Sequence, residues 1–140
     1  MSRKIDELVP ELQEKYAEFK DAMEDAELKY IVTQTRRTQS EQTALSAQGR
    51  KKLEEVNELR KAVGWPALKP AGNVKVTWTM QSKHLEGKAF DIAMIGEDGK
   101  ISWSNFLFDK AGKVGESVGL EWGGSWAKNP DRPHFQLKET

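Results

Sequence analysis

The chain has 140 residues, with 22 basic and 22 acidic side chains, a formal net charge of zero and no cysteine. Zero net charge excludes an overall basic field that would hold nucleic acid or an anionic membrane. The lack of cysteine excludes disulfides and thiolate metal sites, so any metal must be bound by His, Asp or Glu. The length fits one domain, which we expect to span residues 1–140.

The first part of the chain predicts a long helix, a short strand and two further helices. Apolar residues recur at three- and four-residue spacing within residues 3–29, which is typical of one face of an α-helix. The β-branched stretch 30–36 predicts a strand. Thr38 and Glu41 have the spacing of a capping box, so a second helix is expected to begin there. A third helix is expected from about residue 51 to 62.

The second part predicts short antiparallel strands around one more helix. The segment AFDIAMI, the turn GEDGK and the return strand ISW predict a β-hairpin over residues 89–103. Residues 105–119 predict a fourth helix, and LEWGGSW and HFQL predict a final pair of short strands. Helices combined with a small antiparallel sheet indicate an α+β fold.

The only two histidines of the chain, His84 and His134, both lie near an aspartate at the edge of a predicted strand. Alternation in AFDIAMI puts Asp91 on the side opposite the apolar residues, and Gly87 lets the chain bend between His84 and that strand. In HFQL, His134 and Gln136 face away from the apolar side. Two imidazoles and a carboxylate can therefore converge, and three protein ligands with an open fourth position are typical of a catalytic zinc site.

Spacing alone leaves a simpler interpretation open. A single histidine beside a glycine is usually a loop residue or a satisfied core residue, and an aspartate in a strand can protect a sheet edge against aggregation. Before any resemblance is considered, the metal site is therefore one of two interpretations of these residues.

Three separated motifs stand out: SKHLEGKAFD, residues 82–91, WGGSW through DRPHF, residues 122–135, and a stretch at residues 35–50. They resemble those of the zinc D-Ala-D-Ala carboxypeptidases and their relatives, the bacteriophage L-alanyl–D-glutamate endopeptidases. SKHLEGKAFD is similar to the family signature S-x-H-x-x-G-x-A-x-D, and WGGSW through DRPHF resembles the second half of that pattern. Residues 35–50 resemble the stretch R-[ST]-x-x-E-Q-x-x-L-x-x-x-G-R. The resemblance spans residues 30–137, but many relatives have a shorter loop in place of the charged insert 50–73, which leaves substrate preference open.

The resemblance implies a small α+β fold shared with the hedgehog signalling domain, and zinc bound by His84, Asp91 and His134. Asp131 matches the catalytic carboxylate, which would act as a general base. Arg37 matches the arginine that polarises the scissile carbonyl, although its position alone would suggest a salt-bridged surface arginine. Zinc would lower the pKa of water at the site to about 7.

Four further residues are weaker candidates for contacts with substrate or ligands. Ser82 could support the first zinc ligand by a hydrogen bond, or could be a simple turn residue. Arg36 is a weaker candidate than its neighbour for the carbonyl-polarising role. Trp122 and Trp126 lie in a Gly-rich turn and are candidates for a cleft wall, whereas Trp103 is expected in the core. The two glycines between Trp122 and Trp126 are expected to provide positive φ angles.

The resemblance implies a zinc peptidase that cuts the stem peptide of bacterial peptidoglycan, with the L-alanyl–D-glutamate bond as the favoured target. Its small size and the lack of a readable signal peptide or an obvious wall-binding domain resemble a compact phage endolysin without stable membrane association. A monomer is the default expectation. The protein would be made in the host cytoplasm and would reach the wall through a separate pore to cause host lysis. One alternative is a D-alanyl-D-alanine carboxypeptidase. Another is a catalytically inactive zinc-binding interaction module, which would need neither Asp131 nor Arg37. Nucleic-acid binding is disfavoured by the zero net charge.

Overall fold

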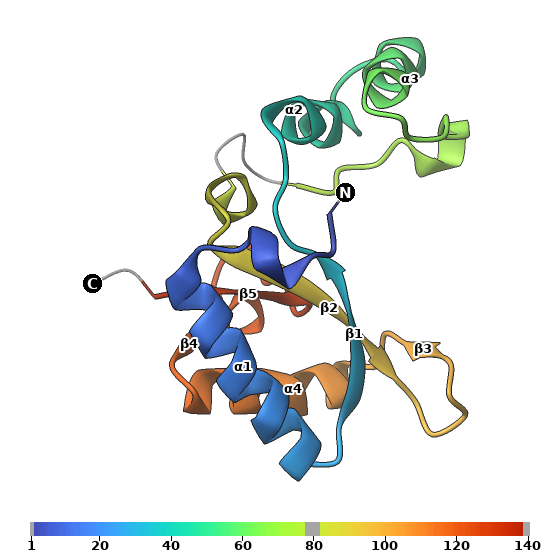
Figure 1. Ribbon diagram of the computed structural model, residues 1–140. Coiled ribbons are helices and arrows are strands. Elements are labelled where there is room, and N and C mark those ends of the chain that lie inside the picture. The colour runs from blue at the N-terminus through green and yellow to red at the C-terminus, as the bar shows by residue number, and fades with distance from the viewer. Residues whose placement is uncertain (1, 78–81, 139–140) are drawn as a thin grey trace.

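A five-stranded antiparallel sheet forms the centre of the computed structural model, which describes residues 2–77 and 82–138 (Figure 1). The strand order is β1-β2-β5-β4, and β3 pairs with the end of β2. The strands are β1 (Lys29–Gln34), β2 (Ala89–Ile95), β3 (Ile101–Ser102), β4 (Leu120–Trp122) and β5 (His134–Leu137).

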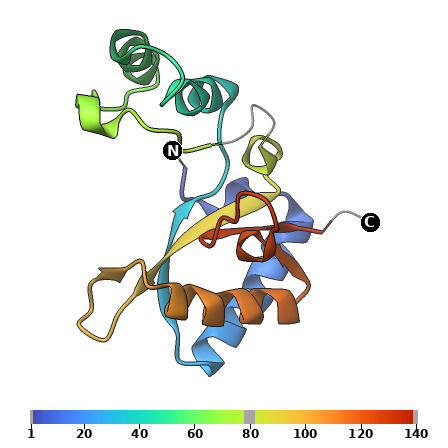
Figure 2. The same cartoon turned by 180° about the vertical axis from the view of Figure 1, so that it is seen from behind.

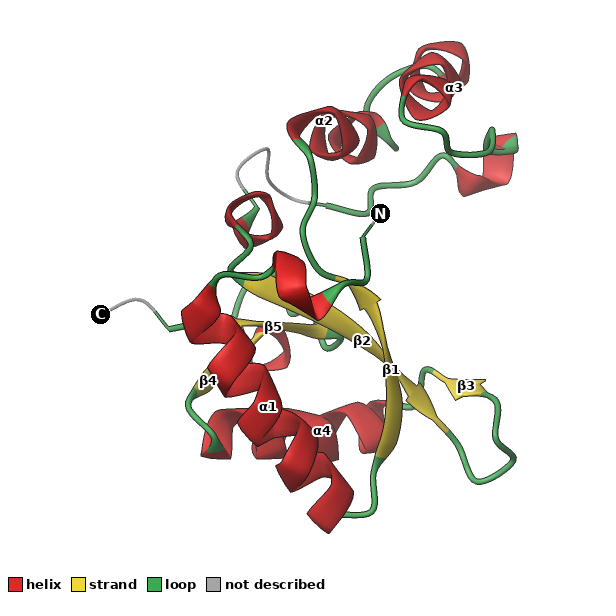
Figure 3. Cartoon of the chain, viewed as in Figure 1, coloured by secondary structure: helices red, strands yellow, loops and turns green. Residues whose placement is uncertain are grey.

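Two of the four α-helices cover one face of the sheet, and the other two lie together beyond one end of β1 (Figures 1 and 3). The view from behind shows α4 crossing below the sheet (Figure 2). The α-helices are α1 (Pro10–Asp25), α2 (Gln39–Ala47), α3 (Leu53–Ala62) and α4 (Asn105–Ser117). Short 3-10 helices are η1 (Ile5–Glu7), η2 (Pro70–Gly72), η3 (Lys83–Glu86) and η4 (Gly123–Ser125). The predicted α+β fold is confirmed. Within the described ranges, no helix has both the length and the apolar character needed to cross a membrane.

The core lies between the sheet and the helices α1 and α4. Phe90 and Phe135 are opposite each other on β2 and β5, and their rings stack with centroids 5.5 Å apart. Phe19 of α1 packs against both rings, with centroid distances of 5.5 and 5.0 Å. All three side chains are fully buried. Because burial of each large apolar side chain contributes about 1.5–3 kcal/mol, this cluster holds α1 and the β2–β5 pair in one arrangement.

The helix expected over residues 3–29 is shorter than predicted. Its α-helical part begins at Pro10, where the missing N–H costs no helical hydrogen bond, and ends at Asp25. The preceding residues form η1, and the Val9 N–H donates to the carbonyl of Gly87 at 3.0 Å. Glu27 then adopts a left-handed φ of 58°, which turns the chain into β1.

The capping box predicted at the start of α2 is confirmed. The Thr38 hydroxyl accepts from the Glu41 N–H at 3.1 Å, and the Glu41 carboxylate accepts from the Thr38 N–H at 2.9 Å. A cap of this kind contributes about 1 kcal/mol. It also fixes the point at which the extended chain after β1 becomes helical, directly after Arg37.

We predict that Gly112→Ala destabilises the protein by about 1–3 kcal/mol, the usual cost of overpacking a core. A Cβ at this position of α4 would lie 2.2 Å from the Trp122 ring, so the helix or the ring must move. Urea denaturation measures the change. The sign of the change in the free energy of unfolding is diagnostic. Without a clash, alanine would stabilise the helix by about 1 kcal/mol, because it is the better helix former.

Lys113→Ala is the matched control, because this neighbouring residue of α4 is exposed. Its free energy of unfolding should stay within about 0.5 kcal/mol of the native value. A Gly112→Ala variant as stable as this control would show that Trp122 does not pack tightly against α4.

Candidate functional site

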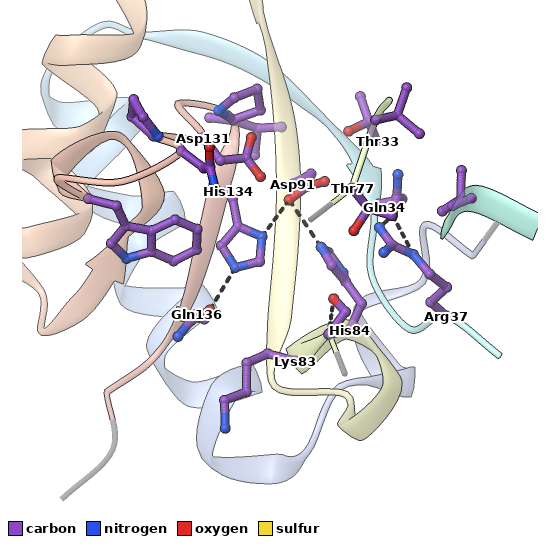
Figure 4. A pocket seen from close by; sticks show the side chains of 18 of the residues that line it. Thr33, Gln34, Arg37, Thr77, Lys83, His84, Asp91, Asp131, His134 and Gln136 are labelled. Carbon is purple, nitrogen blue, oxygen red and sulfur yellow. Dashed lines mark hydrogen bonds and ion pairs between the residues drawn. The ribbon is translucent and has the colours of Figure 1, made fainter. Parts of the chain in front are cut away.

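Two imidazoles and one carboxylate meet on the face of the sheet opposite Phe90 and Phe135 (Figure 4). Asp91 Oδ1 lies 3.1 Å from His84 Nε2 and 3.0 Å from His134 Nδ1. One ligand atom from each of the three residues lies within 4.8 Å of the others. The structure therefore brings together the three residues that the motifs single out.

Each member of this cluster is positioned by a different element. Asp91 and His134 are direct partners in the β2–β5 ladder. His84 comes from η3, where its N–H donates to the Ser82 hydroxyl at 3.2 Å and its carbonyl accepts from the Arg37 N–H at 3.0 Å. Ser82 thus caps the turn that carries the histidine, a role that combines both interpretations of this residue. The expected bend at residue 87 is present, because Gly87 ends η3 with a φ of 69°.

The outer nitrogens of both imidazoles face hydrogen-bond acceptors. His84 Nδ1 lies 2.6 Å from the backbone carbonyl of Thr35, and His134 Nε2 lies 2.8 Å from Oε1 of Gln136. When these nitrogens carry the proton, the nitrogens that face Asp91 carry lone pairs. Outer hydrogen bonds of this kind are typical of metal-binding histidines, because they fix the tautomer and the ring orientation.

The donor set fits a cation. Three electron-pair donors face one another, and they would repel unless a proton or a metal ion lies between them. Tetrahedral zinc with bonds of about 2.0–2.1 Å separates its ligand atoms by about 3.3 Å, close to the contacts at Asp91 Oδ1. Nitrogen and carboxylate ligands of this kind suit zinc and also accept other first-row metals.

Electrostatics at the cluster favour negative charge on Asp91 and positive charge beside it. Burial acts to raise the pKa of Asp91, but the charges and hydrogen bonds of His84 and His134 outweigh burial and hold this pKa well below its usual range. Burial acts to lower the pKa of His134, but the hydrogen bond and charge of Asp91 outweigh burial and raise it. The cluster is therefore a preformed site for positive charge.

The cluster opens into a cavity of about 820 Å³ that is also lined by Arg37, Asp131 and Trp126. Asp131 is held by backbone hydrogen bonds, because its N–H donates to the Gly123 carbonyl at 2.9 Å and its carbonyl accepts from the His134 N–H at 3.2 Å. Burial, followed by the charge of Asp91, raises the pKa of the Asp131 carboxyl. A carboxylate with raised proton affinity beside a metal-binding cluster can act as a general base.

Arg37 is a buried cation on the opposite wall of the cavity. Its guanidinium donates to Oε1 of Gln42 at 2.6 Å and to Oε1 of Gln34 through both Nε, at 3.1 Å, and Nη2. Burial lowers its pKa, although the charge of Asp91 and of other carboxylates opposes this effect. Because both hydrogen-bond partners are neutral amides, the positive charge remains available to an oxygen in the cavity. Arg36 is exposed and does not line the cavity.

Trp126 lines the cavity as predicted, with its ring centroid 5.2 Å from that of His134. The prediction for Trp122 is wrong: it shares the inner side of β4 with Leu120 and packs in the core. The prediction for Trp103 is also wrong. Its side chain is 62% exposed and lines the cavity, because it follows the two-residue strand β3 at the edge of the sheet. Trp78, which also flanks the motifs, lies outside the described residues.

The glycines of the WGGSW turn do not have the predicted positive φ angles. They are required for close approach instead. A Cβ at Gly123 would lie 2.3 Å from the carbonyl oxygen of Asp131, and one at Gly124 would lie 2.2 Å from the Trp122 ring. Any side chain at Gly123 would therefore displace the segment that carries Asp131.

Sequence reasoning assigned no role to the residues that hold the cluster from outside. Gln136 lies two positions after His134, so strand alternation already put both on one face. Gln42 lies in the same motif as Arg37, residues 35–50, and this shared motif could have connected the two residues. Thr35 acts through its backbone carbonyl, which leaves no signal in a single sequence.

Comparison with known proteins agrees with the motifs. Residues 75–137 match the family model described as D-alanyl-D-alanine carboxypeptidase. An L-alanyl-D-glutamate peptidase of Listeria phage A118 is 37% identical over 68 residues, which cover 46% of this chain and 24% of the relative. The peptidoglycan L-alanyl-D-glutamate endopeptidase CwlK of Bacillus subtilis (strain 168) is 29% identical over 118 residues, which cover 76% of this chain and 59% of the relative. The chain thus spans less than two thirds of the length of both curated relatives.

Solved structures share the fold. The L-Ala D-Glu endopeptidase ChiX of Serratia marcescens matches with a TM-score of 0.64 at 21% identity, covering 96% of this chain and 83% of that one. VanYB in complex with D-alanine-D-alanine matches with a TM-score of 0.57 at 17% identity, covering 93% of this chain and 71% of that one. The resemblance predicted from the sequence motifs is confirmed, and the residues that match the D-alanyl-D-alanine carboxypeptidase family model, 75–137, carry His84, Asp91, Asp131 and His134.

Proposed function

We propose that this protein is a zinc-dependent peptidase that cuts the L-alanyl–D-glutamate bond of bacterial peptidoglycan. The observation that carries the proposal is the convergence of His84 Nε2, Asp91 Oδ1 and His134 Nδ1, with both outer imidazole nitrogens facing acceptors. The names of the two curated relatives support the choice of bond. The phage origin of one relative supports a role as an endolysin in host lysis.

Zinc held by these three residues would polarise the scissile carbonyl and lower the pKa of water at the site to about 7. Asp131, on the same side of the cavity as His134, accepts a proton from the attacking water and passes it to the leaving amine. Arg37 stabilises the negative charge that develops on the carbonyl oxygen, since its guanidinium is held rigidly by Gln34 and Gln42.

The charge of the cavity supports an acidic peptide as substrate. Four basic residues line it beside the two carboxylates, namely Arg3, Arg37, Lys83 and Lys128. The stem peptide carries a free carboxylate on its D-glutamate, next to the bond to be cut, and positive charge in a cleft attracts such a group. A D-alanyl-D-alanine end also carries a carboxylate, so the D,D-carboxypeptidase remains the alternative with the same chemistry.

Digestion of purified peptidoglycan tests the reaction and the bond. The native protein should release peptides with a new N-terminal D-glutamate, identified by mass spectrometry. Asp131→Asn should lower kcat by about 10²–10⁴-fold, because the isosteric amide cannot accept the proton. Its zinc content should be unchanged. Release of D-alanine would instead assign the carboxypeptidase, and no release by a zinc-loaded native protein would favour the inactive interaction module.

We predict that Arg37→Lys lowers kcat/KM by about 10²–10³-fold, as expected when a fixed donor to the developing oxyanion is lost. Lysine keeps the charge but cannot bond to Gln34 and Gln42 in the same planar geometry. Steady-state kinetics on a synthetic stem peptide measures the effect. Arg36→Ala is the matched control and should retain native kcat/KM, since this neighbouring arginine is exposed. Equal losses in both variants would contradict the role of Arg37.

Zinc should stabilise the metal-free protein against heat, because only the folded chain assembles the three ligands. At a free zinc concentration 100 times Kd, the gain is about 2.7 kcal/mol. Differential scanning calorimetry with and without zinc measures this gain. Asp131→Asn should keep the stabilisation, and His84→Ala should lose it. Stabilisation of His84→Ala as large as that of the native protein would place the zinc elsewhere.

A further inference from the structure

We propose that Glu121 is a positioning residue that sets the tautomer of His134 through the amide of Gln136. The inference rests on the proposed metal site, but it concerns groups beyond the three ligands and Asp131. Glu121 lies on β4, directly opposite Gln136 on β5. Nε2 of Gln136 donates to Oε2 of Glu121 at 2.9 Å, and Oε1 of Gln136 lies 2.8 Å from His134 Nε2. A continuous chain of hydrogen bonds therefore runs from Glu121 to the cluster.

The orientation of the Gln136 amide decides which nitrogen of His134 carries the proton. An amide can present either its oxygen or its NH2 group to the imidazole, and these two orientations have nearly the same shape. If the oxygen faces His134, Nε2 must carry the proton and Nδ1 has the lone pair that faces Asp91. If the NH2 group faces His134, Nε2 must accept and the proton moves to Nδ1, where it would occupy the metal-binding position.

Glu121 removes this ambiguity because an ionised carboxylate can only accept hydrogen bonds. Its Oε2 can be paired only with the NH2 group of Gln136, which leaves the amide oxygen for His134. His84 needs no such second partner, because its outer nitrogen faces the backbone carbonyl of Thr35, and a carbonyl oxygen can only accept a hydrogen bond. The two histidines thus reach matching states by different means: one through the main chain, the other through two side chains.

The same carboxylate oxygen also holds the wall of the cavity. The indole N–H of Trp126 donates to Oε2 of Glu121 at 3.0 Å, and the Trp126 ring lies against His134 at a tilt of 49°. Both groups that bond to this oxygen are neutral donors. Loss of the carboxylate therefore leaves no unpaired cation, and a variant that lacks it should remain folded.

Glu121→Lys should reverse the polarity of the chain, because an ammonium group can only donate hydrogen bonds. Gln136 must then turn its oxygen toward residue 121 and its NH2 group toward His134. Zinc affinity, measured by competition with a chromophoric chelator, should fall about 10–100-fold, as is usual when an outer partner of a ligand is lost. In the metal-free protein, where Asp91 also faces Nδ1, ¹⁵N NMR should show a larger share of neutral His134 with its proton on Nδ1 than in the native protein.

The double variant E121K/Q136E provides the rescue. Its residue 121 donates an N–H to the carboxylate at 136, and that carboxylate can only accept from His134 Nε2. The tautomer should return to the native one and zinc affinity should recover to within a few-fold, although two residues are changed. A role of Glu121 in packing alone predicts the opposite, with the double variant at least as weak as the single one.

Glu116→Lys is the matched control, because Glu116 accepts a hydrogen bond from Ser125 at 3.0 Å nearby but does not reach the cluster. It should leave tautomer and affinity unchanged. An unchanged tautomer in Glu121→Lys, or no recovery in the double variant, would overturn the inference. Neither readout uses peptidoglycan, so a protein that passes these tests and cuts no stem peptide would overturn the proposed function alone.

Discussion

The register of the β2–β5 pair is the constraint on which the rest of the structure depends. Phe90 faces Phe135 on one side of this pair, and the next rung sets Asp91 against His134 on the other side. Because side chains alternate along a strand, a slip by one residue would move the aromatic rings to the open face and the ligands into the core. The stacking of two buried phenylalanine rings therefore also determines the distance between a carboxylate and an imidazole.

This arrangement lets a hydrophobic core hold together three electron-pair donors, one carboxylate oxygen and two imidazole nitrogens, that would otherwise repel one another. Asp91 Oδ1 and the two facing imidazole nitrogens are 3.0–3.1 Å apart, which is favourable only with positive charge between them. The opposing elements cannot relax apart easily. His84 is tied to Thr35 after β1, and His134 is tied to Gln136 within β5. Folding has already assembled the three side chains, so little of the binding energy of a cation is needed to bring them together.

Much of this site could be predicted from single strands, and the failures have a common physical cause. The sides of β2 and β5 were predictable because their alternation contrasts large apolar residues with polar ones. Alternation in the three-residue strand β4 cannot show which side is covered by a helix, so Trp122 was assigned to the cleft although it packs against α4. Trp103 was assigned to the core because of its size, yet it follows an edge strand of two residues. A backbone hydrogen-bond acceptor such as the Thr35 carbonyl depends on tertiary structure alone.

The turn between β4 and β5 shows how the core also positions Asp131, the proposed general base. Trp122 points into the core and Trp126 toward the cavity, and the chain reverses between them at Gly123 and Gly124. The Gly123 carbonyl binds the N–H of Asp131, and the absence of a side chain at Gly123 allows the Asp131 carbonyl to come close. The base is therefore tied to the same β4–β5 unit that carries His134 and the Glu121–Gln136 pair. Asp131 and His134 are also joined directly, because the Asp131 carbonyl accepts from the His134 N–H at 3.2 Å, so a shift of the turn would move both residues. The proposed reaction requires the zinc ligands, Asp131 and Arg37 around one carbonyl. Arg37, which precedes α2, is held by Gln34 and Gln42 and not by the β4–β5 unit, so this reaction depends on the alignment of that arginine with the unit.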